Sequence, residues 1–252
     1  IITKPKGSGE KMKKTLLTLA AASALSVSAQ AEQFWADNSV SVLYGSDYEF
    51  NTDVDTTTLT LEHVSGHSWG GLFYFVDRHN GGDYKETYGE FSPTFNLTKM
   101  DGFVTGLNLA YTYEFGTFQT GEFDFANPNF HSAFDNHLFG LGADLKVPGM
   151  DFVSATVFRA INEGGDDDTQ LTLVYGAHFG DIIIDGFMDY SFGADNAEDS
   201  MNLTPQITYN VGPMLGLKNK VKVGLEYSYW TNQFGIDGQD QNAVSLLLKA
   251  HL

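Results

Sequence analysis

The stretch 58–96 decides the fold, because three of its segments alternate with a period of two residues. They read TLTLEH (58–63), WGGLFYFVDR (69–78) and YGEFSPTFN (88–96). In the first segment, Leu59 and Leu61 alternate with Thr60 and Glu62. Successive side chains of a β-strand point to opposite faces. The three segments are therefore predicted to be strands that separate an apolar medium from a more polar one.

The same alternation recurs along the rest of the chain. Twelve segments are predicted to be strands: Ser39–Tyr44, Thr56–Val64, Ser68–Arg78, Tyr88–Thr98, Phe103–Phe115, Asn136–Val147, Phe152–Asn162, Thr169–Phe179, Ile182–Phe192, Asn202–Asn210, Lys220–Trp230 and Asn242–Leu252. Most of them match the ~9–11 residues with which a tilted barrel strand crosses a bilayer. No linker or change of composition divides these segments, so they are interpreted as one domain.

The connections between these segments give a second indication. Every second connection is predicted to be short: Ser65–His67, Lys99–Gly102, Pro148–Asp151 and Gly180–Asp181, with Val211–Asn219 somewhat longer. The others are mostly longer and rich in Gly, Asp and Asn: Gly45–Asp55, His79–Thr87, Gly116–Asp135, Glu163–Asp168, Gly193–Met201 and Thr231–Gln241. Short turns on one rim and long loops on the other are typical of outer-membrane barrels.

The N-terminal part reads as an export signal. From Met12 the chain continues KKTLLTLAAASALSVSAQA, with two lysines before an apolar core and small residues at its end. This pattern predicts a signal peptide over 12–31 that is cleaved after Ala31. Residues 1–11 are interpreted as upstream sequence or a cloning remnant. The mature domain is then predicted to be 32–252, located in the bacterial outer membrane.

Composition narrows the class further. The chain of 252 residues has a formal net charge of −18 and no cysteine. An acidic chain is a poor nucleic-acid binder, and a chain without cysteine must fold without disulfides. An exported chain of alternating strands is either a soluble β protein or an outer-membrane barrel. The signal peptide and the loop pattern favour an all-β, transmembrane, antiparallel up-and-down β-barrel of about twelve strands, with its apolar face toward lipid.

The polar faces would then line a pore. The expected pore-lining residues combine carboxylates, aromatic rings and a serine: Glu62, Asp77, Glu90, Glu114, Asp189, Glu226, Trp69, Phe73, Phe75, Phe187, Trp230 and Ser92. Rings stack on flat ligands and carboxylates accept hydrogen bonds, which suits nucleosides and some sugars. The alternative is that these acids only hydrate the pore and pair with its few candidate cations, Lys146, Lys222 and Lys249.

Other chemistry is weakly indicated. His63 and Ser65 share one face at a strand end, which is the minimum for a lipid-cleaving barrel enzyme. A single pair with no evident third residue to orient the histidine is more often incidental, so we do not expect an enzyme. The loop acids Asp166, Asp167 and Asp168 lack the ligand periodicity of a calcium site. No metal and no cofactor is predicted.

Several motifs resemble the nucleoside-specific channel-forming outer-membrane proteins, the Tsx-like family, whose vibrio relatives serve as phage receptors. The similar segments are Phe34-Trp35 with NSVSVLYGS (38–46), LTLE (59–62), Trp69 to Asp77, GEFSPTF (89–95), DGFMDY (185–190) and EYSYW (226–230). The resemblance implies a monomeric barrel of twelve strands with a narrow pore for nucleosides. It also implies that Glu62, Trp69, Phe73, Phe75, Asp77 and Glu90 line that pore.

The function expected from residues and resemblance together is passive, selective diffusion of nucleosides and related ring-bearing solutes. The expected partners are these solutes, outer-membrane lipid and lipopolysaccharide. The alternative is a general or occluded barrel that acts as a structural protein or as a phage or surface receptor through its outer loops.

Overall fold

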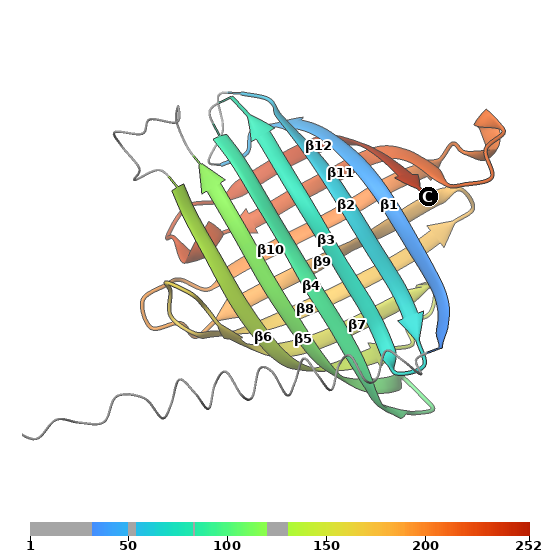
Figure 1. The fold of residues 1–252 in the computed structure, drawn as a ribbon, viewed down its shortest axis with the longest axis horizontal. Coiled ribbons are helices and arrows are strands. Elements are labelled where there is room, and N and C mark those ends of the chain that lie inside the picture. Colours follow the sequence, from blue (N-terminus) through green and yellow to red (C-terminus); the bar gives the residue numbers. More distant parts are fainter. Residues whose placement is uncertain (1–31, 50–53, 83, 120–130) are drawn as a thin grey trace, which may run out of the picture.

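The computed structural model is a closed antiparallel barrel of twelve strands, in which every strand pairs with its neighbours in sequence and β1 pairs with β12. It describes residues 32–49, 54–82, 84–119 and 131–252. The strands are β1 (Gln33–Ser46), β2 (Thr56–His67), β3 (Gly70–Gly81), β4 (Tyr84–Lys99), β5 (Val104–Gln119), β6 (His131–Leu145), β7 (Phe152–Ile161), β8 (Asp168–Phe179), β9 (Ile182–Phe192), β10 (Ser200–Asn210), β11 (Val221–Thr231) and β12 (Gln241–His251). In Figure 1 the early strands, blue to green, form the near wall and the later strands, orange to red, lie behind them.

The predicted strand count and order are confirmed, whereas one predicted loop is wrong. The connection His79–Thr87 was expected to be long, but β3 and β4 stay paired until Gly81 meets Tyr84. The polar run around Asn80 and Lys85 breaks the apolar alternation without breaking the backbone ladder. A barrel strand can continue past the bilayer, where its outer face no longer needs apolar residues. The rule that loop length alternates therefore fails at this connection.

The two faces of the wall have opposite character. Outward side chains are apolar and exposed, as with Leu61 at 52 %, Leu141 at 62 % and Leu246 at 63 % of their maximum. Inward positions on the same strands carry small polar residues that are buried, such as Thr58 and Ser245. A water-soluble barrel has the reverse arrangement, because it must bury its apolar face. The apolar exterior therefore faces lipid, and every backbone ladder is closed, as a bilayer requires.

The interior is not uniformly polar. On the wall formed by β5, β6 and β7, Ala110, Leu138, Phe158 and Ala160 pack together as a small buried cluster. This cluster gives one side of the interior an apolar lining. Two short 3-10 helices, Pro213–Leu215 and Gln233–Gly235, lie in the β10–β11 and β11–β12 connections. Within the described ranges, no helix is both long and apolar enough to cross a membrane.

The rim that carries the first residues of β1 and the last residues of β12 also carries the tight turns β2–β3 and β8–β9. Short turns and chain ends lie on the periplasmic side of outer-membrane barrels. We therefore name this edge the periplasmic rim and the opposite edge the outer rim.

Candidate permeation pathway

A row of acids follows the hydrogen-bonding direction across the inner wall of the barrel. Strand register places Glu62 beside Phe75, Phe75 beside Glu90, Glu90 beside Glu114, and Glu114 beside Asn136. Directly paired residues of an antiparallel ladder hold their side chains about 5 Å apart. Two carboxylates therefore lie side by side with an aromatic ring at one end of the pair and an amide at the other.

Hydrogen bonds fix the two central acids. The Tyr88 hydroxyl donates to Glu90 Oε1 at 2.7 Å, and the Asn136 amide donates to Glu114 Oε2 at 3.0 Å. Ser92 lies next to Glu90, 3.5 Å from its Oε2, and accepts a hydrogen bond from Thr112. The carboxylates are thus oriented by uncharged donors, and their remaining acceptor sites stay available to a solute.

More acids face this row from the other side of the lumen. Asp189 on β9 accepts hydrogen bonds from Thr172 Oγ1 at 2.5 Å and from Gln170 Nε2 at 3.1 Å. It is close enough to interact electrostatically with both Glu90 and Glu114. The strand order puts β9 on the far side of the barrel from β4 and β5, so these acids face one another across the lumen.

A second pair of acids lies beside this constriction. Glu226 accepts a hydrogen bond from Gln206 Nε2 at 2.7 Å and interacts electrostatically with Asp77. One carboxylate oxygen of Asp77, Oδ1, is buried and has no hydrogen-bond partner. Together, the residues Asp77, Glu90, Glu114, Asp189 and Glu226 form what we call the acidic constriction.

Aromatic rings line one side of the acidic constriction. Ring centroids lie 5.6 Å apart for Phe73 and Phe75, 5.7 Å for Phe75 and Tyr88, and 6.2 Å for Tyr88 and Phe134. These distances are typical of interacting aromatic pairs. The four rings come from β3, β4 and β6 and make a continuous ladder along which a flat solute could stack.

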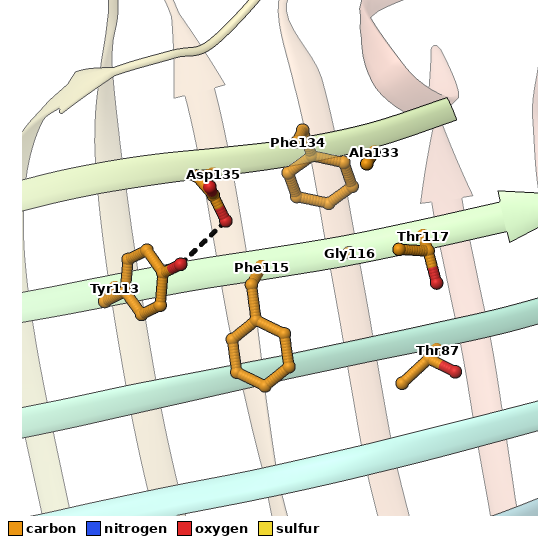
Figure 2. A pocket seen from close by; sticks show the side chains of 8 residues that line it. All are labelled: Thr87, Tyr113, Phe115, Gly116, Thr117, Ala133, Phe134 and Asp135. Atoms are coloured by element: carbon orange, nitrogen blue, oxygen red, sulfur yellow. Dashed lines mark hydrogen bonds between the residues drawn. The ribbon is translucent and has the colours of Figure 1, made fainter. Parts of the chain in front are cut away.

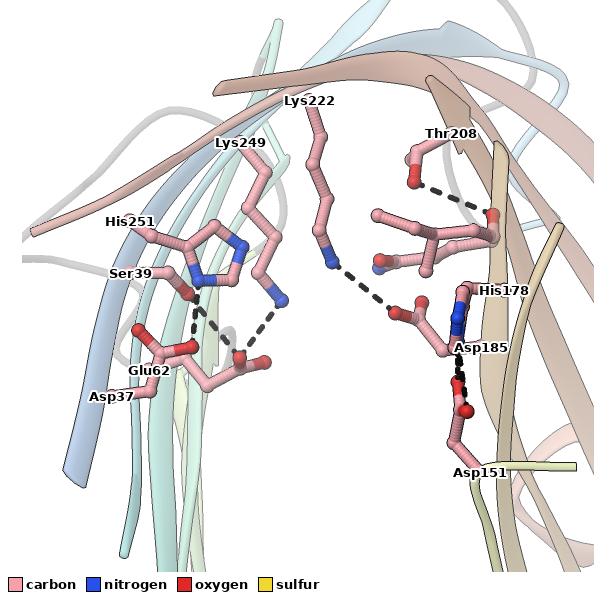
Figure 3. Close-up of polar contacts among 12 residues, drawn as sticks. Asp37, Ser39, Glu62, Asp151, His178, Asp185, Thr208, Lys222, Lys249 and His251 are labelled. Carbon is pink, nitrogen blue, oxygen red and sulfur yellow. Dashed lines mark hydrogen bonds and ion pairs between the residues drawn. The ribbon is translucent and has the colours of Figure 1, made fainter. Parts of the chain in front are cut away.

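Two lysines lie closer to the periplasmic rim. Lys222 and Lys249 are paired in register on β11 and β12, and both are buried. Lys249 Nζ lies 2.8 Å from Glu62 Oε1, and Lys222 Nζ lies 3.4 Å from Asp185 Oδ2. Figure 3 shows both lysines pointing into the lumen toward acids on different walls. The third candidate cation, Lys146, is an exposed residue of the periplasmic turn after β6.

The structure also places the remaining predicted residues. Phe187 lies two residues from Asp189 on β9, with Thr204 as its register partner. Trp230 sits at the outer end of β11, where its indole N–H donates to Ser200 Oγ at 2.8 Å and Phe234 packs on it edge-on. Trp230 therefore lines the outer entrance and lies away from the acidic constriction.

The prediction that Trp69 lines the pore is wrong. Trp69 lies in the tight turn between β2 and β3, where its ring stacks on His67 at 4.9 Å and meets the tilted ring of Phe95 at 5.2 Å. Phe95 belongs to the lipid-facing side of β4 and is 40 % exposed. The period-two alternation of β3 starts after this turn, so it does not assign a face to Trp69. The residue lies on the outer surface near the periplasmic rim, not in the pore.

Sequence reasoning missed three residues that line the lumen. Tyr88 and Phe134 share the inward parity of Glu90 and Asn136, so periodicity could have found them. Tyr48 could not be found in this way, because it follows β1 in an outer loop. Its hydroxyl lies 2.6 Å from Ser245 Oγ on the inner face of β12. Burial raises the pKa of this hydroxyl, and either it or the Ser245 hydroxyl donates the hydrogen bond between them.

A hollow of about 400 Å³ lies on the outer wall and not in the lumen. Its lining includes Tyr113, Phe115 and Thr117, which have the outward parity of β5, and the Tyr113 hydroxyl donates to Asp135 at 2.7 Å (Figure 2). The hollow thus opens toward lipid near the outer rim. It plays no part in the permeation pathway.

A closed barrel with an apolar exterior and a charged interior defines the class: the protein is an outer-membrane β-barrel. No protein-family model and no curated protein matches the chain. Among solved structures, it is similar to the KdgM porin in complex with disordered oligogalacturonate, with 13 % identity and a TM-score of 0.49 over 84 % of this chain and 98 % of that one. It is also similar to Omp33 of Acinetobacter baumannii, with 9 % identity and a TM-score of 0.38 over 87 % and 98 %. At such identities the likeness concerns the barrel fold and does not identify a substrate.

Proposed function

We propose that this protein is a passive outer-membrane channel that selects small ring-bearing solutes with several hydrogen-bond donors, and that nucleosides are its substrate class. The observation that carries the proposal is the aromatic ladder beside the acidic constriction. A nucleobase can stack on Phe75 or Tyr88 while ribose hydroxyls donate to Glu90 and Glu114. The resemblance of several motifs to the Tsx-like family supports the same substrate class.

The charge distribution favours neutral and cationic solutes. Both lumen lysines are already engaged by Glu62 and Asp185. Within the described residues, no Lys or Arg forms an ion pair with any acid of the acidic constriction. Carboxylates in a narrow lumen repel anions, so a nucleoside should pass more readily than its phosphorylated form. Binding at each position must stay weak, because conduction requires departure as well as entry.

Single-channel recording in planar bilayers tests this proposal. We expect adenosine and thymidine to interrupt the ion current at concentrations at which arabinose and sucrose do not. Liposome swelling should show the same order of permeation. Equal rates for nucleosides and sugars of similar size would leave only a general pore.

The receptor alternative remains a separate prediction. Most of the outer loop that was expected to carry it, residues 120–130, lies outside the described residues. Deletion of that loop should abolish phage adsorption if the receptor alternative is right, and it should leave nucleoside block intact if the channel proposal is right.

A further inference from the structure

Four polar side chains form a linear network on the lipid-facing side of β1 and β2. Asn38 Oδ1 lies 2.8 Å from His63 Nδ1, and His63 Nε2 lies 2.9 Å from Ser65 Oγ. Ser65 Oγ also lies 2.9 Å from His67 Nε2. The sequence indicated only the His63–Ser65 pair, because Asn38 comes from the neighbouring strand, where it is the register partner of His63.

The chemistry of the four groups sets the direction of the hydrogen bonds. The amide oxygen of Asn38 can only accept, so His63 Nδ1 carries the proton and its Nε2 is the free acceptor of a neutral ring. Ser65 then donates to His63 Nε2. The one hydroxyl proton is used there, so His67 Nε2 must donate to Ser65 Oγ. This arrangement has an orienting group, a base and a hydroxyl in the order of a Ser-His-Asn triad.

The ring of each histidine stacks on a neighbouring aromatic ring, which fixes its orientation. His63 stacks on Tyr74 with centroids 4.7 Å apart and an angle of 14° between the planes, and His67 stacks on Trp69 at 4.9 Å and 9°. Tyr74 is a lipid-facing residue of β3 that is 40 % exposed. Aromatic residues of this kind mark the level of the lipid headgroups, where the ester bonds of phospholipids begin. The network is thus fixed on the outer face near the periplasmic rim.

We propose that Asn38, His63, Ser65 and His67 form a second functional site, an acyl-ester hydrolase whose substrate class is membrane phospholipid. Ser65 Oγ attacks the ester carbonyl carbon while its proton passes to His63 Nε2. His67 Nε2–H donates to the oxyanion, and the collapse of the intermediate releases a lysophospholipid, whose oxygen takes the proton from His63. Water, activated by His63, then cleaves the acyl-serine and releases a fatty acid. Asn38 acts as a positioning residue.

Access to the nucleophile depends on His67. Ser65 is only 2 % exposed, because the rings on either side of it cover the hydroxyl. His67 is the last residue of β2 before the turn, so a rotation of its side chain opens Ser65 from the periplasmic side without moving the barrel wall. The ester oxygen can then take the hydrogen bond that His67 gives to Ser65 in the structure.

The test uses the folded barrel in phospholipid vesicles and has two readouts. A fluorophosphonate probe should label Ser65, located by peptide mass spectrometry, and the vesicles should release fatty acid. Ser65→Ala and His63→Gln should abolish both signals. His67→Phe keeps a ring to stack on Trp69 but removes the donor, and it should slow release by roughly 10²-fold. Asn38→Leu should slow labelling and change its pH profile, and Asn38→Asp should restore both.

Ser41→Ala is the matched control, because Ser41 is a buried serine of β1 on the lumen side. It should keep both signals. The proposal is overturned if the unaltered protein releases no more fatty acid than Ser65→Ala, or if labelling of Ser65 persists in His63→Gln. All four residues lie outside the lumen, so Ser65→Ala should leave channel conductance unchanged. The channel function and the hydrolase function can therefore be confirmed or refuted independently.

Discussion

At the scale of single residues, the pairing of Glu90 with Glu114 places two carboxyl groups side by side on the inner wall of the lumen. Each acid accepts a hydrogen bond from an uncharged donor, and neither forms an ion pair with a Lys or Arg of the described residues. This arrangement attracts cations and gives a solute two acceptors at once. The inward direction of these side chains can be predicted from the alternation along each strand. Their adjacency depends on the register between strands, which the alternation does not give.

We expect Glu90→Gln to reduce the cation selectivity of the pore. The change keeps the size of the side chain and replaces an ionisable carboxyl group of the pair with a neutral amide. The reversal potential in a potassium chloride gradient should move toward zero, and in Glu90→Gln with Glu114→Gln it should move further. Glu163→Gln, at the outer rim beside Asp135, is the control and should have little effect. An unchanged potential in the double variant would contradict the placement of the constriction.

Phe75 is expected to supply stacking for the solute. Stacking of a base on an aromatic side chain contributes ~1–3 kcal/mol, so Phe75→Ala should weaken nucleoside block by about tenfold. Phe91→Ala removes a similar ring from the lipid-facing side of β4 and should leave the block as it was. The measurement is the nucleoside concentration that halves the open time of the channel. Equal effects of the two substitutions would rule out stacking on the ladder.

Tyr48 is expected to narrow the outer half of the lumen. Tyr48→Ala removes the ring and its bond to Ser245, and should raise single-channel conductance. Ser245→Ala removes only the partner hydroxyl, so a smaller rise with more current noise is expected. A conductance that stays constant in Tyr48→Ala would show that the ring does not restrict the ion path.

At the scale of elements, close approach of strands explains particular glycines. A Cβ on Gly224 of β11 would lie 2.1 Å from the backbone oxygen of Ile207 on β10. A side chain there must push the two strands apart, because backbone atoms of a closed ladder cannot yield. Gly165, in the β7–β8 loop, has only Asn162 Cβ nearby, at 3.9 Å.

We therefore expect Gly224→Val to lower the temperature at which the barrel unfolds, while Gly165→Val leaves it unchanged. Folded barrels migrate differently from unfolded chains in unheated gels, which gives a direct measurement. If both variants unfold at the temperature of the unaltered protein, the β10–β11 contact is looser than the structure indicates.

Periodicity predicted the elements well and their ends less well. Alternation identifies a strand only where lipid makes its outer face apolar, so the polar ends of β3, β4 and β6 were assigned to loops. The same limit explains Trp69: alternation extended from β3 predicts an inward side chain, but Trp69 lies in the turn before the strand begins at Gly70. The alternation of side chains between two faces applies only within a strand and does not extend to turn residues.

At the scale of the whole molecule, the sequence predicts a lipid-facing barrel because apolar residues alternate along its strands. It does not predict which side chains face one another across the lumen. Asp189 meets Glu90 and Glu114 only after closure brings β9 opposite β4 and β5. The same holds on the outside, where Asn38 reaches His63 from the neighbouring strand. Sites built between strands emerge from topology and register.

The seam between β1 and β12 has a consequence for how the protein is made. These strands carry the first and last segments of the barrel, and they join through register pairs from Ser39–His251 to Ser46–Val244. Until β12 arrives, the sheet keeps two open edges whose unpaired amides cannot enter hydrocarbon. Insertion therefore requires either the complete set of strands or a partner that pairs the two open edges. Any factor that delivers the chain has to shield a nearly finished sheet until its first strand meets its last.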